Sequence, residues 1–193
     1  MGSRRLGRKR LHSLDKQGQS LTAAQLGMGA GISPALVRAT QTREGLISVI
    51  EIVLDLGTSK ADIASYANAN DIIGVDGVDS TLFDANDTDV FGRLLEVEMV
   101  CFEDLAGGDD DVILTHHTAK ITNNQANVDA SAGTQSAIDK TDWDAGVSDR
   151  LAFEAQPGRY WTLVSGDTAA GTYTAGKLVV RITGQIDAPD SDI

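Results

Sequence analysis

The sequence predicts an all-β fold, with a β-sandwich or jelly-roll-like body over residues 46–193 and an extended basic arm and connector over residues 1–45. Apolar and polar residues alternate in several short segments, as they do in half-buried strands. The chain contains 20 Gly and only 3 Pro, with many Ala, Thr and Asp, which favours short strands and tight turns over long helices. Its 193 residues suffice for one good core.

The first 16 residues, MGSRRLGRKRLHSLDK, form a cationic segment ahead of an acidic body. Their net charge is +5, from Asp15 and the basic residues Arg4, Arg5, Arg8, Lys9, Arg10 and Lys16. Because the whole chain carries −12, residues 17–193 carry −17. A short basic segment has little intrinsic order and is attracted to negatively charged surfaces. We therefore expect this arm to act as a tether that gains structure when an acidic partner neutralises it.

Glycines and a proline interrupt each apolar run over residues 21–45, so we interpret that segment as an extended connector. The first predicted strand, 46–56, reads LISVIEIVLDL. Its core face is formed by Ile50, Ile52, Leu54 and Leu56, and its other face by Val49, Glu51, Val53 and Asp55. Residues 57–90 are rich in Gly, Asn and Asp and are predicted to be mostly loop.

A second strand is predicted over 94–102, where a helix is the rival interpretation. One of its faces is formed by Leu95, Val97, Met99 and Cys101. A short third strand is predicted over 112–117, and the polar segment 118–146 shows little periodicity. Further strands are predicted over 151–155, 160–165 and 177–186, the last with a face formed by Leu178, Val180, Ile182 and Ile186. Short alternating strands at near-regular spacing are typical of a sandwich or jelly roll.

A single cysteine, Cys101, excludes an intrachain disulfide and a cysteine-based zinc site, because both need at least two thiols. We expect Cys101 in the core. No apolar run approaches the roughly 20 residues that span a bilayer, and no signal-peptide segment is expected after the basic start. These observations predict a soluble protein made in a reducing cytoplasm, without a membrane partner. The acidic body is expected to repel nucleic acid.

Asp87, Asp89, Gly92 and Glu98 occupy positions 1, 3, 6 and 12 of a calcium-loop pattern. Position 5 is Phe91, which has no oxygen to offer, and the flanking helices that the pattern needs are not predicted. We therefore do not expect calcium there. A second acidic cluster, the run 109–111 near Glu103 and Asp104, is interpreted as a solvated turn.

His116 and His117 are adjacent, so on a strand their side chains point to opposite faces and are not expected to bind one metal. The sequence holds no Ser, His and acid set with a nucleophile elbow. The glycine-rich pieces 27–31 and 106–109 lack the Lys and Ser/Thr of a phosphate loop. We therefore expect no catalytic residue, no metal and no cofactor, and we interpret the protein as not an enzyme.

Several segments together resemble the small head decoration, or cement, proteins of marine tailed bacteriophages. They are RRLGRKRLHSLDKQGQSLT, LISVIEIVLDL, DIIGVDG at 71–77, EVEMVCFED at 96–104 and GTYTAGKLVVRITGQI. The resemblance implies a β-sandwich or jelly-roll body on the outside of the capsid, where major capsid protein subunits meet. It also implies a trimer, terminal arms that clamp neighbouring capsomers, and no catalytic or metal residues. The acidic stretches 79–89 and 118–146 have no counterpart in it.

We therefore expect a viral structural protein, a capsid decoration protein that stabilises the major capsid shell from outside. Its expected partners are the major capsid protein and further copies of itself in a trimer, and its expected location is the virion, after synthesis in the host cytoplasm. The alternatives are a head fibre base or receptor-binding module, and a nucleic-acid-associated protein that uses the basic arm. That arm has no aromatic residue for stacking on bases. A cupin-type enzyme is disfavoured, because it needs a cluster of His and carboxylates.

Overall fold

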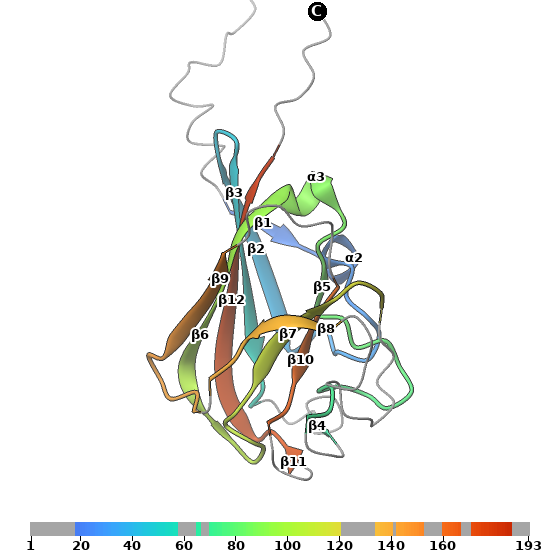
Figure 1. Ribbon diagram of the computed structural model, residues 1–193, viewed down its shortest axis with the longest axis vertical. Helices are drawn as coiled ribbons and strands as arrows, with labels where there is room; N and C mark the ends of the chain where they lie inside the picture. The colour runs from blue at the N-terminus through green and yellow to red at the C-terminus, as the bar shows by residue number, and fades with distance from the viewer. Residues whose placement is uncertain are drawn as a thin grey trace, which may run out of the picture.

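The computed structural model describes residues 18–57, 65–66, 70–120, 134–140, 142–152, 160–166 and 171–186. Within these ranges the chain forms antiparallel sheets, which confirms the predicted all-β class (Figure 1). The two larger sheets contribute to one shared apolar core. Residues 1–17, which include the predicted cationic segment, lie outside the described residues.

The larger sheet has six strands in the order β1-β2-β3-β12-β6-β9. Their bounds are Gln19–Leu21 for β1, Val37–Glu44 for β2, Ile47–Asp55 for β3, Ala175–Gln185 for β12, Arg93–Ala106 for β6 and Ser148–Ala152 for β9. All neighbouring pairs in this sheet run antiparallel. Because β12 lies between β3 and β6, the last described strand occupies the centre of the sheet.

The smaller sheet has four strands in the order β5-β10-β7-β8. Their bounds are Phe83–Asp84 for β5, Tyr160–Val164 for β10, Ile113–His117 for β7 and Thr134–Ile138 for β8. The short strands β4 (Ser65–Tyr66) and β11 (Gly171–Thr172) pair with each other. The described ranges also contain two single-turn helices, α2 (Ala23–Leu26) and α3 (Thr88–Phe91).

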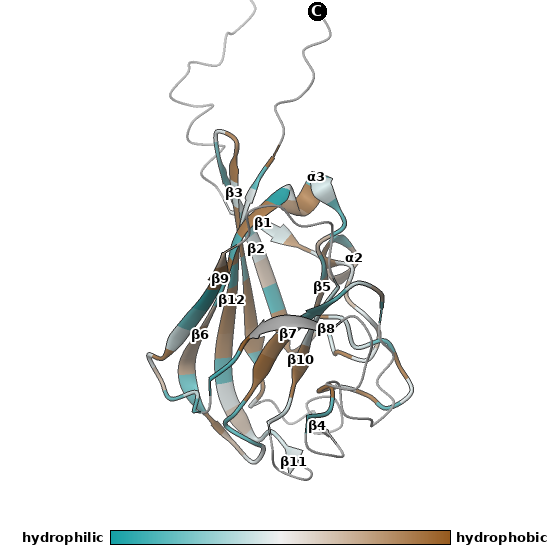
Figure 2. Cartoon of the chain, viewed as in Figure 1, coloured by the Kyte–Doolittle hydropathy of each residue, from teal (hydrophilic) through white to brown (hydrophobic). Residues whose placement is uncertain are grey.

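The core lies between the two larger sheets, and apolar residues concentrate on their strands (Figure 2). The long strands β3, β12 and β6 bury alternate side chains, which are Ile50, Ile52, Leu54, Leu178, Val180, Ile182, Val97, Met99 and Cys101. The smaller sheet contributes Trp161, whose ring stacks on Phe83 with the centroids 5.2 Å apart. Phe83 also stacks on Phe91 of α3 at 5.6 Å, so this helix is fixed to the core.

The prediction of an extended connector over 21–45 is wrong. β2 pairs with β3 along its whole length, and β1 pairs with β2. The alternation on β2 is weak in hydropathy, because its core-facing residues are the small Ala39 and the amide Gln41, with Thr40 and Thr42 exposed beside them. The sheet therefore begins at Gln19, and only the residues before it remain candidates for an arm.

Strand β6 differs from its prediction in register and length. From the pair Thr183–Glu96 to the pair Gly184–Leu94, β12 advances by one residue and β6 by two, so Leu95 is an extra, bulged residue. The bulge puts Leu94, 5% exposed, on the core face. The prediction that Leu95 shares a face with Val97, Met99 and Cys101 was therefore wrong. β6 also continues to Ala106, beyond the predicted end at 102.

Four shorter elements formed in segments predicted as loop or as polar chain without periodicity. β4, β5 and the first three residues of α3 lie within 57–90, and β8 lies within 118–146. β9 begins at Ser148, before the predicted start, and residues 153–155 of that predicted strand lie outside the described residues. The strand order does not by itself establish a jelly roll, so that finer part of the fold prediction stays a prediction.

Candidate functional site

The first candidate surface surrounds the start of the described chain. Gly18 is the first described residue, and it leads into β1 at the edge of the larger sheet. The predicted arm residues all lie outside the described residues; they are Arg4, Arg5, Arg8, Lys9, Arg10 and Lys16. The residues around this junction are therefore the first candidate interaction surface.

Both ends of the described chain lie at one end of the larger sheet (Figure 1). Gln19 of β1 is opposite Gln41, three residues before β2 ends. Gln185, the last residue of β12, is opposite Ile47, the first residue of β3. The start of β1 and the end of β12 therefore lie beside the turn between β2 and β3. We call this region the hairpin end, defined by Gln19, Gln185 and the turn at Gly45.

The turn between β2 and β3 carries two exposed apolar side chains. Glu44 pairs with Ile47, which leaves Gly45 and Leu46 as a two-residue loop. Gly45 has a φ of 63°, as glycine does at the first loop position of tight hairpin turns. Leu46 and Ile47 are 46% and 38% exposed. We call these two residues the apolar tip. It was not predicted, because Leu46 was assigned to the first strand.

Gln41 joins the two strands below the apolar tip. Its side chain is buried, and its amide nitrogen donates to Ser48 Oγ of β3 at 2.9 Å and to the carbonyl oxygen of Val90 at 2.7 Å. On the same strand, the Arg43 guanidinium donates to the carbonyl oxygen of Asp89 at 2.9 Å. The hairpin and α3 are thus fastened together by side-chain hydrogen bonds, in addition to the strand pairing.

A second candidate surface is the outward face of the larger sheet. Arg181 of β12 lies between two carboxylates, with Nη2 2.9 Å from Glu51 Oε1 and Nη1 3.0 Å from Glu98 Oε2. The hydrogen bond to Glu51 is the main cause that raises the pKa of Arg181. Four residues before Arg181, on the same face of β12, Lys177 pairs with Glu103 on β6. Each cation on this part of β12 therefore has a carboxylate partner.

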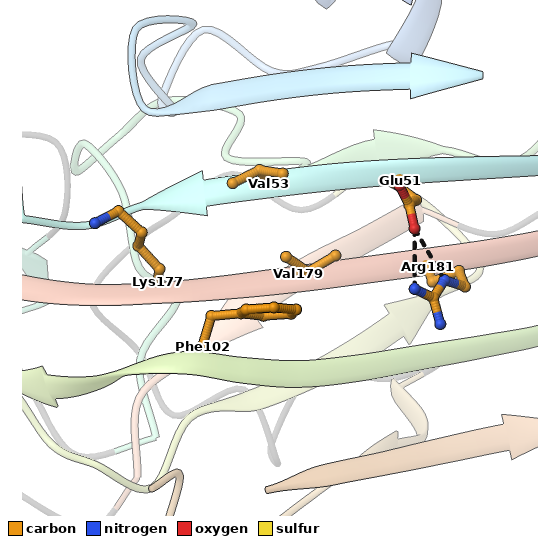
Figure 3. Close-up of a pocket in the computed structure, with 6 residues that line it drawn as sticks. All are labelled: Glu51, Val53, Phe102, Lys177, Val179 and Arg181. Carbon is orange, nitrogen blue, oxygen red and sulfur yellow. Dashed lines mark hydrogen bonds and ion pairs between the residues drawn. The ribbon is translucent and has the colours of Figure 1, made fainter. Parts of the chain in front are cut away.

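Between these two ion pairs lies a shallow groove of about 320 Å³. Figure 3 shows Val53, Val179 and Phe102 between Lys177 at one end and Arg181 at the other. The ring of Phe102 is 63% exposed. Because both cations are paired, the groove presents an apolar ring to a partner and offers no unpaired cation to an anion.

The residues of the calcium-loop pattern serve other purposes. Asp87 Oδ1 accepts hydrogen bonds from two backbone N–H groups in the first turn of α3, so Asp87 caps that helix. Phe91 is fully buried in the core, and Glu98 is bound to Arg181 on the outward face. Across the described residues, no group of three or more His, Cys, Asp or Glu is placed to hold a metal ion.

The acidic run 109–111 forms a turn that is held by hydrogen bonds to one carboxylate oxygen and to two main-chain carbonyl oxygens. The backbone N–H of Asp111 donates to Asp109 Oδ1 at 3.2 Å, and the Tyr173 hydroxyl donates to the carbonyl oxygen of Asp109 at 2.8 Å. The carbonyl oxygen of Asp110 accepts a hydrogen bond from the backbone of Trp143 at 3.1 Å. These contacts agree with the interpretation of the run as a turn after a strand.

His116 and His117 of β7 are both buried, at 3% and 1% exposure. The His116 ring packs on Trp161 with the centroids 4.9 Å apart, whereas His117 Nε2 lies 2.8 Å from Thr162 Oγ1. Desolvation by burial lowers the pKa of His117 to about 4, so this imidazole is neutral at pH 7. The two rings contact different partners and do not converge on one site.

Cys101 is buried, which confirms its predicted place in the core. Its Sγ lies 3.0 Å from the carbonyl oxygen of Trp143 and 3.2 Å from that of Glu103, so the single S–H proton has two acceptors within reach. Burial raises the pKa of the thiol, which keeps it protonated and weakly nucleophilic at neutral pH. Cys101 therefore acts as a small core residue that also joins β6 to the segment before β9.

Comparisons with protein-family models, curated proteins and solved structures found no match. In the part of the chain that the structure describes, no helix has the length and apolar character needed to cross a membrane. The geometry of the described residues thus leaves two candidate interaction surfaces, the hairpin end and the groove beside Phe102.

Proposed function

We propose that this protein is a capsid decoration protein, a viral structural protein that binds the outside of the major capsid shell and stabilises it by clamping neighbouring capsomers. The observation that carries the proposal is the division of charge, with +5 on residues 1–16 and −17 on residues 17–193. A cationic arm on an acidic body suits attachment to an acidic protein surface, while repulsion between bodies opposes aggregation. The resemblance to head decoration proteins favours the same function.

The dimensions of the arm fit this role. Because β1 begins at Gln19, the arm is shorter than residues 1–45. Its 17 residues before Gly18 reach up to about 60 Å at an extended rise of about 3.3–3.6 Å per residue. This length allows the arm to contact one capsid subunit while the body contacts another. The second contact then forms at a high effective concentration, so several weak contacts bind collectively.

The proposal assigns no catalytic role to the chain. Side chains that often carry catalysis have structural partners here. The His117 imidazole lies against the Thr162 hydroxyl, the Cys101 thiol has two main-chain carbonyls within reach, and Asp87 caps α3. These contacts support a protein whose function is binding.

The test is cosedimentation with empty shells of the major capsid protein encoded with this chain. Removal of residues 1–17 is expected to leave the unfolding temperature unchanged, because the sequence of this segment has no periodic apolar face to pack on a core. Shell binding is expected to fall at least tenfold, since a charge-assisted hydrogen bond contributes roughly 1.5–3 kcal/mol when buried in a contact. Replacement of the five basic residues by Gln should cause most of this loss; they are Arg4, Arg5, Arg8, Lys9 and Arg10.

The matched controls are Arg38→Gln and Arg150→Gln, which remove exposed cations from the body and should leave shell binding unchanged. If the truncated protein decorates shells as well as the intact protein does, the arm is not the tether and the proposal fails.

A nucleic-acid-associated protein is the second candidate, because the same arm offers side chains that bind phosphates. Salt dependence separates the two functions. A protein that makes about six to ten phosphate contacts loses about 10³–10⁵ in affinity between 50 and 200 mM salt. We expect binding to shells to weaken less than this over the same range. Duplex DNA that binds as tightly as shells, with the steep salt dependence, would favour the alternative.

A further inference from the structure

The composition of the apolar tip conflicts with its place in the fold. Two-residue hairpin loops favour Gly, Asn, Asp and Ser, but here Gly45 is followed by Leu46 and Ile47. A Cβ placed on Gly45 would meet no other atom within 4 Å, so the turn projects into open space. Leu46 and Ile47 remain 46% and 38% exposed, so each keeps a substantial part of its apolar surface in solvent. Residues that depart from the usual preferences of their local structure, without a compensating gain in packing, are expected mainly at functional or strained sites.

The apolar tip is also held in place by the surrounding strands. The backbone N–H of Ile186 donates to the carbonyl oxygen of Leu46 at 2.8 Å, so the chain after β12 supports the turn. Below the tip, Gln41 links β2 to Ser48 of β3 and to Val90. A preformed apolar projection has little conformational entropy left to lose when it enters a pocket, which favours binding.

The tip lies on the side from which an arm approaches. The hairpin end holds both Gln19, where the arm joins β1, and the turn at Gly45. A surface that binds the start of the arm therefore also lies within reach of Leu46. Phe102, by contrast, lies on the outward face of the sheet, in the groove beside Val179.

We propose that Leu46 and Ile47 form an apolar anchor that inserts into an apolar pocket on the acidic protein surface that the arm binds. This inference rests on the proposed function, because it gives the arm's partner a second contact. The arm supplies long-range attraction, and the buried anchor supplies the close contact that slows dissociation. The choice of a protein partner follows from the proposed function. An anionic lipid surface would attract the arm in the same way, and it is the competing outcome of the test.

The test uses the full chain with the double substitution Leu46→Asn and Ile47→Thr. Asn suits a tight turn and Thr suits a strand, so the variant is expected to fold with an unchanged unfolding temperature. Binding to the same empty shells should fall roughly 10–100-fold, as expected for the loss of two buried apolar side chains. Val75→Thr is the matched control, since it removes apolar character from an exposed residue outside both candidate surfaces with little change of shape, and it should bind like the unaltered protein.

The outcomes separate this inference from the proposed function. If removal of residues 1–17 weakens shell binding and the tip variant binds normally, the anchor is wrong and the proposed function stands. If Val75→Thr loses as much binding as the tip variant, the anchor is also wrong. If the full chain does not bind shells, both proposals fall. Vesicles of phosphatidylserine and phosphatidylcholine serve as the lipid probe, and vesicle binding that depends on Leu46 would overturn the protein partner.

Discussion

The buried side chain of Gln41 donates a hydrogen bond of 2.9 Å to the hydroxyl of Ser48 and so joins β2 to β3 below the apolar tip. The same amide nitrogen also donates to the carbonyl oxygen of Val90 at 2.7 Å. A buried polar pair stabilises a fold only while its members keep their partners, because an unsatisfied group retains its full desolvation cost. The buried amide therefore helps to hold the hairpin against α3, together with the strand pairing and the Arg43 hydrogen bond.

We predict that Gln41→Ala lowers the free energy of unfolding by about 1–3 kcal/mol, because it leaves the Ser48 hydroxyl and the Val90 carbonyl without this donor. Urea unfolding followed by circular dichroism measures the change. The matched control is Gln19→Ala, which removes the same side chain from an exposed position on β1 and should shift stability by less than about 0.5 kcal/mol. Equal effects of the two substitutions would contradict a structural role for the buried amide.

Gly29 provides a second prediction, because its backbone lies close to the segment that follows Gly77. Its N–H donates to the carbonyl oxygen of Thr81 at 2.8 Å, and a Cβ on Gly29 would lie 2.1 Å from the carbonyl oxygen of Asp79. We expect Gly29→Ala to destabilise the protein by about 1–3 kcal/mol through overpacking. Gly18→Ala, where a Cβ finds ordinary contacts from 3.7 Å outward, should be nearly neutral, and urea unfolding followed by circular dichroism measures both variants. A neutral Gly29→Ala would show that the two segments separate easily.

The residues explain which parts of the fold were predictable. The core faces of β3 and β12 were predicted correctly, because Ile50, Ile52, Val180 and similar aliphatic side chains recur at every second position, and most charged residues lie between them. β2 was missed because Gln41 occupies a core position and is satisfied by Val90, 49 residues away. A hydrogen bond over that separation leaves no local pattern in the sequence.

The bulge in β6 shows a different limit. Leu94 and Leu95 are adjacent and equally apolar, so either one could face the core. The choice is made by the partner strand, where Gly184 pairs with Leu94 after Thr183 pairs with Glu96. Pairing with a strand that lies about 90 residues later decides the register, and no window of local sequence contains it.

The candidate site was predictable only in part. The basic residues of the arm stand out as a charge cluster, but they lie outside the described residues, so their role stays a prediction. The sequence around the apolar tip does contain a usable signal. Gly45 stands between a polar alternating segment and an aliphatic one, which is typical of a hairpin turn, and the two apolar residues after it are unusual there. Their exposure, however, required the pairing of β2 with β3.

Chelation is expected to leave the protein unchanged. Asp87 is engaged as a helix cap, and Glu98 is paired with Arg181, so both are already committed to other partners. We predict the same unfolding temperature with and without 5 mM EDTA, a concentration on the order of that needed to strip weak calcium modules. Addition of calcium serves as the reverse control. A fall of several degrees in EDTA, restored by calcium, would contradict this account of the acidic residues.

The last prediction concerns acid stability, because burial lowers the pKa of His117 to about 4 from its ordinary value of 6.5. Between these two values the unfolded chain binds a proton at this site and the folded chain does not, so stability must fall as the pH drops from 6.5 toward 4. The loss assigned to this residue is about 3 kcal/mol, and most of it should appear by pH 4.5. His117→Gln removes the titrating group while keeping a side chain able to bond Thr162. The stability lost on acidification should therefore be about 2–3 kcal/mol smaller in this variant than in the unaltered protein. Urea unfolding at pH 7 and pH 4.5 measures the change in the free energy of unfolding for both proteins. The control is His12→Gln in the predicted arm, which should lose as much stability on acidification as the unaltered protein. If His117→Gln and the unaltered protein lose the same stability on acidification, other groups govern the acid response, and the buried imidazole takes no part in it.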